Sequence, residues 1–200
     1  MLLRAPAVTL ADRLRASLAL KPRDNLLAGD LIEGAPDAGH EAAVLVAITD
    51  RPEPGVLLTV RREHMRTHAG QVSFPGGRLD AGEDAIAAAL REAEEEIGLP
   101  ADRVELWGTA DPYRTVTGYR VTPVLGMVPP DLPLAPHEHE VADWFEAPLS
   151  FLLDTANQQR MTTEFQGRTR QYYQIDWEGR RIWGATAAMI VNLTRRLDWA

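Results

Sequence analysis

The segment "REAEEEIG", residues 91–98, places four glutamates within six positions. On a helix each residue advances by about 100°, so Glu92, Glu95 and Glu96 share one face while Glu94 lies on the other side. Three carboxylates within one turn repel one another, and a hard divalent cation such as Mg²⁺ turns that repulsion into binding because it prefers oxygen ligands. On this stretch alone, a solvated acidic helix face is the commoner outcome of such a run. A metal site therefore needs a second, independent feature.

The residues that precede this run supply that feature. Gly76 and Gly77 allow the backbone to turn tightly and to approach a ligand closely. Glu83 follows in a loop, eight residues before Arg91. A loop carboxylate at this spacing can fold back and pair with the guanidinium, which would fix the loop against the helix. The two features together predict an organised acidic site.

The joint pattern resembles the signature of the Nudix hydrolases, G-x5-E-x7-R-E-U-x-E-E-x-G-U, in which U is a bulky apolar residue. It begins at Gly77 and ends at Leu99, and every fixed position matches. Only Ala93, at a U position, is smaller than usual. The resemblance implies an α/β fold of the Nudix type, an α/β/α sandwich with a mixed β-sheet. It also implies hydrolysis of a nucleoside diphosphate linked to another moiety.

The resemblance carries over to individual residues. Glu92, Glu95 and Glu96 match the family's ligands for Mg²⁺ or Mn²⁺, and Arg91 and Glu83 match the residues that stabilise the loop and the helix. These five residues are the expected catalytic set. Metal ions neutralise the charge of a diphosphate and lower the pKa of bound water.

A carboxylate must also act as the general base toward the attacking water. Members of the family differ in which carboxylate does so, and Glu95 is the candidate in this chain. Glu138 and Glu140, in the segment "PHEHEVADWF", are weaker candidates, because a solvated loop is the commoner place for such residues.

A second motif lies just upstream, in "LLTVRREHMRTHAGQVSFPGG", residues 57–77. It resembles the additional motif of Nudix coenzyme A pyrophosphatases, L-L-T-x-R-S-x3-R-x3-G-x3-F-P-G-G, except that Arg62 replaces the serine. Arginines suit coenzyme A because it carries a 3′-phosphate besides its diphosphate, and a guanidinium can bind phosphate with two hydrogen bonds. The residues that we expect to bind the substrate are Arg61, Arg66, Gly70, Phe74, Gly76 and Gly77.

The expected activity is therefore metal-dependent hydrolysis of the diphosphate bond of coenzyme A or acyl-CoA, giving 3′,5′-ADP and (acyl-)4′-phosphopantetheine. One alternative is a Nudix pyrophosphatase for another nucleoside diphosphate derivative, such as ADP-ribose, NADH or a dinucleoside polyphosphate. Another is a non-catalytic Nudix domain that binds a nucleotide. Such domains often lose signature carboxylates, whereas this chain retains all of them.

The composition bounds these readings. The 200 residues, 45% hydrophobic and 25% charged, suit a single domain (1–200) with a sizeable core. The absence of cysteine excludes disulfides and thiolate catalysis, and the net charge of −8 argues against nucleic acid as a partner. The N-terminus lacks the apolar run of a signal peptide, and no segment approaches a membrane span. We expect a cytoplasmic protein that acts on a small molecule.

The elements that must position these residues follow from periodicity and turn signals. Helices are expected at about 8–19, from Asp84 to Ile97 with Gly98 as the stop, at 148–154 and at 184–197. Strands are expected at 41–48, 55–61, 104–111, 119–128 and 141–146, and a hairpin-rich extension of the sheet at 161–183. The core of the domain is expected to span about 40–190.

Overall fold

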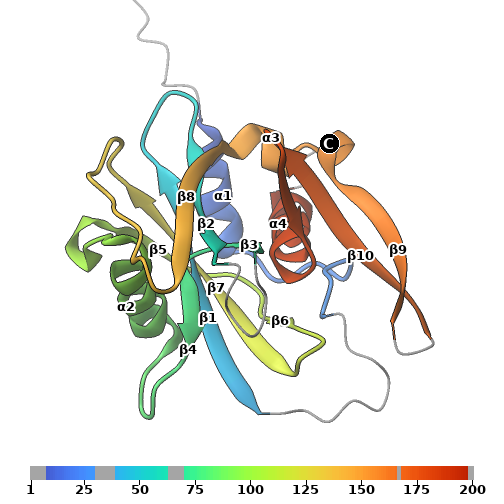
Figure 1. The fold of residues 1–200 in the computed structure, drawn as a ribbon. Helices are drawn as coiled ribbons and strands as arrows, with labels where there is room; N and C mark the ends of the chain where they lie inside the picture. The colour runs from blue at the N-terminus through green and yellow to red at the C-terminus, as the bar shows by residue number, and fades with distance from the viewer. Residues whose placement is uncertain (1–7, 30–38, 63–69, 166–167, 198–200) are drawn as a thin grey trace, which may run out of the picture.

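The computed structural model describes residues 8–29, 39–62, 70–165 and 168–197 (Figure 1). Its centre is an eight-stranded sheet in which the order β3-β2-β1-β7-β5 is extended by β4 on β1, β6 on β7 and β8 on β2. Strands β1 and β7 are parallel, and the other strand pairs of this sheet are antiparallel. The sheet is mixed, as predicted. Its strands are β1 (His40–Thr49), β2 (Gly55–Arg61), β3 (Val72–Ser73), β4 (Gly76–Arg78), β5 (Glu105–Thr109), β6 (Tyr113–Arg114), β7 (Tyr119–Val128) and β8 (Val141–Pro148).

Helices cover both faces of this sheet, which confirms the predicted α/β/α sandwich. One face packs against α2 (Ala85–Ile97), and the other against α1 (Leu10–Leu18), α3 (Leu149–Leu153) and α4 (Ala185–Leu197). Two short 3-10 turns, η1 (Ala101–Arg103) and η2 (Thr155–Asn157), follow α2 and α3.

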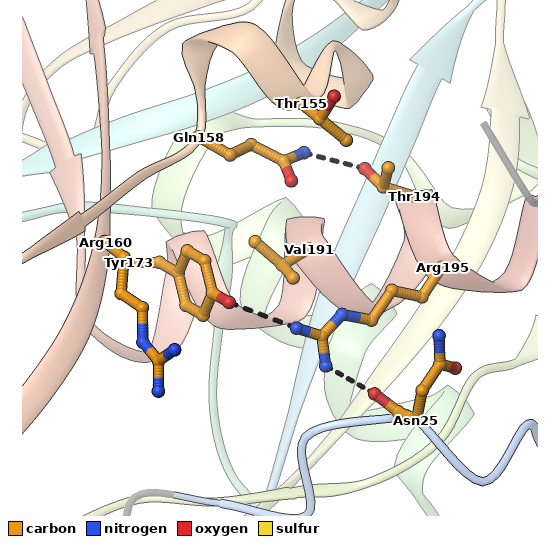
Figure 2. Close-up of a pocket in the computed structure, with 8 residues that line it drawn as sticks. All are labelled: Asn25, Thr155, Gln158, Arg160, Tyr173, Val191, Thr194 and Arg195. Carbon is orange, nitrogen blue, oxygen red and sulfur yellow. Dashed lines mark hydrogen bonds between the residues drawn. The ribbon is translucent and has the colours of Figure 1, made fainter. Parts of the chain in front are cut away.

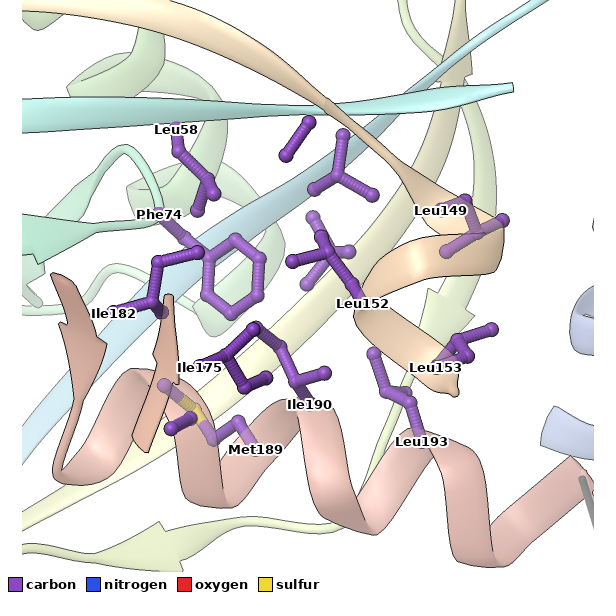
Figure 3. Close-up of a cluster of buried hydrophobic side chains, with 14 of the residues drawn as sticks. Leu58, Phe74, Leu149, Leu152, Leu153, Ile175, Ile182, Met189, Ile190 and Leu193 are labelled. Atoms are coloured by element: carbon purple, nitrogen blue, oxygen red, sulfur yellow. The ribbon is translucent and has the colours of Figure 1, made fainter. Parts of the chain in front are cut away.

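The buried side chains form two clusters, one on each face of the sheet. In the larger cluster, Leu58 and Phe74 from the sheet side meet Leu152 of α3 and Ile190 of α4 (Figure 3). The smaller cluster lies under α2 and contains small residues of that helix such as Ala93. These small side chains let α2 lie close to the sheet, and this closeness sets the position of its acidic face.

Local signals define the ends of α2. The side chain of Asp84 accepts a hydrogen bond from the N–H of Ala87 at 2.8 Å, which caps the first turn. Gly98 adopts a left-handed conformation (φ 66°) at the other end, which a glycine reaches at little cost. The predicted helix and its stop are confirmed, with Asp84 as the cap rather than the first helical residue.

The segment 161–183 departs from the prediction. Strands β9 (Gln159–Phe165), β10 (Arg168–Trp177) and β11 (Arg180–Trp183) form a separate three-stranded sheet instead of extending the main one. Its inward-facing residues Ile175 and Ile182 are fully buried in the larger cluster. Side-chain packing, rather than a shared ladder of hydrogen bonds, therefore joins this sheet to the rest of the molecule. No helix in the described ranges is long and apolar enough to cross a membrane.

Arg196, at the end of α4, forms a buried ion pair with Asp111 and hydrogen bonds to the end of α1. Arg196, whose side chain is 6% exposed, donates two hydrogen bonds to the Asp111 carboxylate and others to the carbonyl oxygens of Ser17 (2.6 Å) and Leu20 (3.3 Å). The side chain of Asp111 is itself only 17% exposed. Removal of the guanidinium would leave this carboxylate unpaired in a dry setting.

We therefore predict that Arg196→Met lowers the free energy of unfolding by about 3–5 kcal/mol, the usual cost of breaking a buried ion pair. Urea denaturation followed by circular dichroism measures it. The control is Arg15→Met, which removes the exposed pair with Glu105 and should cost less than about 1 kcal/mol. Equal losses in the two variants would contradict the role assigned to Arg196.

Candidate active site

Arg91 lies at the centre of the acidic cluster. Its Nε and Nη2 each donate to one oxygen of Glu83 at 3.0 Å, and Nη2 also donates to the carbonyl oxygen of Arg78. Its Nη1 donates to Glu92 at 2.9 Å and to Glu95 at 3.1 Å. The predicted pairing of Glu83 with Arg91 is confirmed, and the bidentate geometry fixes the loop against α2.

The electrostatic consequences differ along this network. The hydrogen bond from Arg91 lowers the pKa of Glu83, with a smaller contribution from the N–H of Asp80. Burial raises the pKa of Glu92, even though the guanidinium of Arg91 opposes that shift. Glu83 is therefore a fixed anion that anchors the loop, whereas Glu92 carries a charge that its surroundings only partly stabilise.

The three glutamates of the predicted metal site lie in unequal environments. Glu96 is 2% exposed, the side chain of Glu92 is 15% exposed and that of Glu95 is 59% exposed. The position of Glu94 on the exposed side is as predicted. Although the three carboxylates occupy one side of the helix, that side runs from the core (Glu96) to solvent (Glu95).

Glu96 is the most perturbed of these groups. Burial raises its pKa to about 7, although Arg61 and a hydrogen bond from the N–H of Gly76 act in the opposite direction. The charges of Glu92 and Glu140 add to the increase. A buried carboxylate with too little positive charge around it is a group that a cation would stabilise.

Neither Gly76 nor Gly77, the two glycines before the loop, has room for a side chain. A Cβ on Gly76 would lie 2.3 Å from the carbonyl oxygen of Ala43 and 2.6 Å from the Cα of Val44 in β1. A Cβ on Gly77 would lie 2.3 Å from Oε1 of Glu92. The close approaches are thus to β1 and to a glutamate of the site, so packing accounts for both glycines before any ligand is considered.

The second motif brings one arginine to the acidic cluster. Nη1 of Arg61 lies 3.8 Å from Oε1 of Glu96, and the buried Nε of Arg61 has no hydrogen-bond partner among the described residues. Gly70, in a left-handed conformation (φ 68°), donates its N–H to the carbonyl oxygen of Arg61. Arg66 lies outside the described residues. Arg61 and Gly70 therefore belong to one local structure at the edge of the site.

Phe74 corrects the predicted set of substrate-binding residues. Its ring is 1% exposed and packs in the larger core cluster with Leu58 and Ile182 (Figure 3). A ring in this position holds the Phe-Pro-Gly-Gly turn on the core. We assign it to packing and not to contact with the substrate.

Glu140 lies closer to the acidic cluster than the sequence indicated. The loop that carries it docks on the end of α2, where the N–H of His137 donates to the carbonyl oxygen of Glu96 at 2.8 Å. Its own carbonyl oxygen accepts from the N–H of Arg62, and its charge contributes to the raised pKa of Glu92 and Glu96. This proximity depends on a contact between distant segments, so the sequence held no local signal for it.

Among the described residues, no three carboxylate or imidazole groups converge into a ready-made metal site. The donor set nevertheless has the chemistry that Mg²⁺ or Mn²⁺ requires, because Glu92 and Glu96 are oxygen donors in a setting that disfavours their charge. Glu95 would join them after a rotation of its side chain away from Arg91. The residues present thus fit a divalent cation, and Glu92 and Glu96 are the residues that would hold it.

The raised pKa of Glu96 predicts how stability depends on pH. Its pKa rises from 4.5 to about 7 on folding. As the pH rises from 4.5 to 7, the free energy of unfolding of the metal-free protein should therefore fall by at most about 3 kcal/mol. The reason is that the unfolded chain releases this proton at a lower pH than the folded protein does. Glu96→Gln should flatten this part of the profile of melting temperature in EDTA, and Glu94→Gln, on the exposed side, should not. A profile unchanged by Glu96→Gln would contradict the burial of a charge at this position.

Comparison with known proteins agrees with this geometry. A family model described as NUDIX domain matches residues 39–173. A protein called "Uncharacterized Nudix hydrolase NudL" from Escherichia coli (strain K12) is 46% identical over 159 residues, which cover 79% of this chain and 83% of that protein. A protein of the same name from Shigella flexneri is 41% identical over 192 residues, 96% of each chain.

Among solved structures, a Nudix hydrolase from M. Smegmatis, RenU, is similar with a TM-score of 0.50 and 26% identity. The similarity covers 57% of this chain and 74% of that one. The matched family model spans all eight strands of the main sheet and the whole acidic cluster. The chain therefore belongs to the Nudix hydrolase family.

Proposed function

We propose that this protein hydrolyses the diphosphate bond of coenzyme A or an acyl-CoA, with 3′,5′-ADP and 4′-phosphopantetheine or its acyl form as products. The observation that carries the proposal is the position of Arg61, a residue of the second motif, 3.8 Å from the buried carboxylate of Glu96. A guanidinium there can bind the oxygens of a diphosphate that lies over the acidic end of α2. This contact supports a diphosphate as the substrate, and the resemblance of the second motif supports coenzyme A among such substrates.

In this proposal Glu92, Glu95 and Glu96 hold Mg²⁺ or Mn²⁺, which when bound would neutralise the diphosphate and acidify a water molecule. Arg61 binds phosphate oxygens and stabilises the charge that develops on them. Arg91 holds Glu92 in place and keeps the loop of Glu83 on the helix.

A carboxylate must accept the proton of the attacking water. Glu95 is the proposed base, because its exposed side chain lies at the solvent edge of the cluster. Glu140 is the second candidate, since its charge acts on both Glu92 and Glu96.

Parallel assays of coenzyme A, ADP-ribose, NADH and diadenosine polyphosphates with Mg²⁺ or Mn²⁺ test the substrate. We expect the highest kcat/KM for coenzyme A, and Glu96→Gln should lower kcat by a factor of about 100 or more because it removes a ligand charge from the site. Glu94→Gln is the matched control and should retain activity. Turnover of another substrate but not of coenzyme A would refute the specificity, whereas near-normal activity of Glu96→Gln would refute the metal site.

The role of Arg61 has a test of its own. Arg61→Gln should lower kcat/KM by about 10- to 100-fold, the effect of losing a charged hydrogen bond in the transition state. Because Arg61 lies beside Glu96, we expect it to bind the diphosphate, so the loss should be equal for coenzyme A and 3′-dephospho-coenzyme A. Arg62→Gln is the control for general loss of charge. A loss confined to coenzyme A would instead assign Arg61 to the 3′-phosphate.

A further inference from the structure

A cavity lies on the opposite side of the main sheet from α2. It lies between α4, the strands β9 and β10 and the segment that follows α1, with a volume of about 410 Å³ (Figure 2). Volumes of about 300–1,000 Å³ are usual for sites that bind small molecules. The residues that line it are Asn25, Thr155, Gln158, Arg160, Tyr173, Val191, Thr194 and Arg195. The residues proposed for hydrolysis contribute nothing to its wall.

Two guanidinium groups occupy this cavity, and one is held in a fixed orientation by neutral groups. Arg195 donates from Nη2 to the hydroxyl of Tyr173 at 3.1 Å and from Nη1 to the carbonyl oxygen of Asn25 (Figure 2). Arg160, across from it on β9, donates to the side chain of Gln171. A guanidinium has five N–H donors, so each of these groups retains donors for a ligand.

The described lining of the cavity carries positive charge and no counter-charge. Neither Arg160 nor Arg195 forms an ion pair with a described carboxylate, and the lining described for this cavity includes no acidic residue. Its positive charge contrasts with the net charge of −8 of the whole chain. Charge of this kind, held in a concave wall, attracts an anion.

The neighbouring residue Arg196, at the same helix end, has a structural role that Arg195 does not share. Both arginines lie in the last turn of α4, where a cation complements the helix dipole. Arg196 is buried against Asp111 and two carbonyl groups. Arg195 is only partly buried and faces the cavity, so the helix dipole alone does not account for its position.

Hydrogen bonds hold two polar side chains of the cavity wall, Gln158 and Thr194, in place. The side-chain amide of Gln158 donates to Thr194 at 2.7 Å and to the carbonyl oxygen of Leu152 at 2.9 Å (Figure 2). The hydroxyl of Thr194 also lies within hydrogen-bond distance of the carbonyl oxygens of Leu153 and Ile190. Groups fixed in this way lose little conformational entropy when a ligand binds.

A smaller cavity of about 180 Å³ adjoins the first and shares Arg160, Tyr173 and Arg195 with it. Apolar and aromatic residues contribute to its wall, among them Leu27, Tyr113 and Ala188, in contrast to the polar wall of the larger cavity. The two arginines therefore stand where a polar space meets a more apolar one. A ligand that fits both has an anionic group attached to an apolar or aromatic part.

We propose that this pair of cavities is a second binding site, separate from the acidic cluster, for a phosphate monoester with a ring system, such as a nucleoside monophosphate. Arg160 and Arg195 bind the phosphate with charge-assisted hydrogen bonds, and the hydroxyl of Tyr173 adds a further contact. The ring lies in the smaller cavity against Leu27 and Ala188. No covalent step is involved.

Calorimetric titration of the full-length protein with AMP, in EDTA, tests the site. Without divalent metal the acidic cluster repels anions, so binding measured in this way reports on the arginine cavity. We expect wild type to bind AMP, and the double variant Arg160→Gln/Arg195→Gln to bind it at least about tenfold more weakly. Glu96→Gln should bind AMP as wild type does.

The matched control is Arg15→Gln, which removes an exposed arginine that pairs with Glu105 and lines neither cavity. It should bind AMP as wild type does. The single variant Arg195→Lys and thermal melts of every variant separate a lost contact from a lost fold. Absence of AMP binding by wild type would overturn the proposal, as would unchanged binding by a folded double variant. Equal affinity for inorganic phosphate and AMP would overturn the assignment of the smaller cavity.

Discussion

The guanidinium of Arg91 is the interaction on which the acidic site depends. It binds a loop carboxylate (Glu83), a loop carbonyl (Arg78) and two helix carboxylates (Glu92 and Glu95) at once. Carboxylates this close repel strongly wherever water is scarce, so one central cation both positions them and limits their repulsion. It does not reach the deepest carboxylate. The charge that remains there is what makes the cluster receptive to a cation.

Strand β1 connects the acidic cluster to the rest of the fold. It pairs with β7 on one side and with β2 and β4 on the other, so its backbone is held along most of its length. Gly76 of β4 lies against the backbone of β1 and donates its N–H to Glu96 at 3.2 Å. Gly77 lies directly under the carboxylate of Glu92. Two glycines thus connect a central strand of the sheet to the two most buried carboxylates of the helix.

Much of this could be predicted from the sequence, because the information was local. Asp84 and Gly98 mark the two ends of the helix that lies between them. The Glu83–Arg91 pair follows from the spacing between the loop and the helix. The family and the mixed sheet were implied by the resemblance of the signature, and the apolar runs predicted the individual strands. Burial could not be predicted in the same way. Helical phase groups Glu95 and Glu96 on one side, but only the packing of α2 on the sheet places one in solvent and the other in the core.

Three other features of the structure could not be predicted from the sequence for the same reason. The approach of Glu140 to the acidic cluster, the burial of the Phe74 ring and the separation of the second sheet all depend on contacts between distant segments. Consecutive arginines at the end of α4 are the sharpest case. Nothing in the dipeptide distinguishes Arg195 from Arg196, yet about 100° of helical rotation turns one toward Asp111 and the other toward a cavity without an acid. The two side chains therefore differ in their surroundings. Arg196 pairs with a carboxylate of the chain, whereas Arg195 keeps N–H donors that face the cavity.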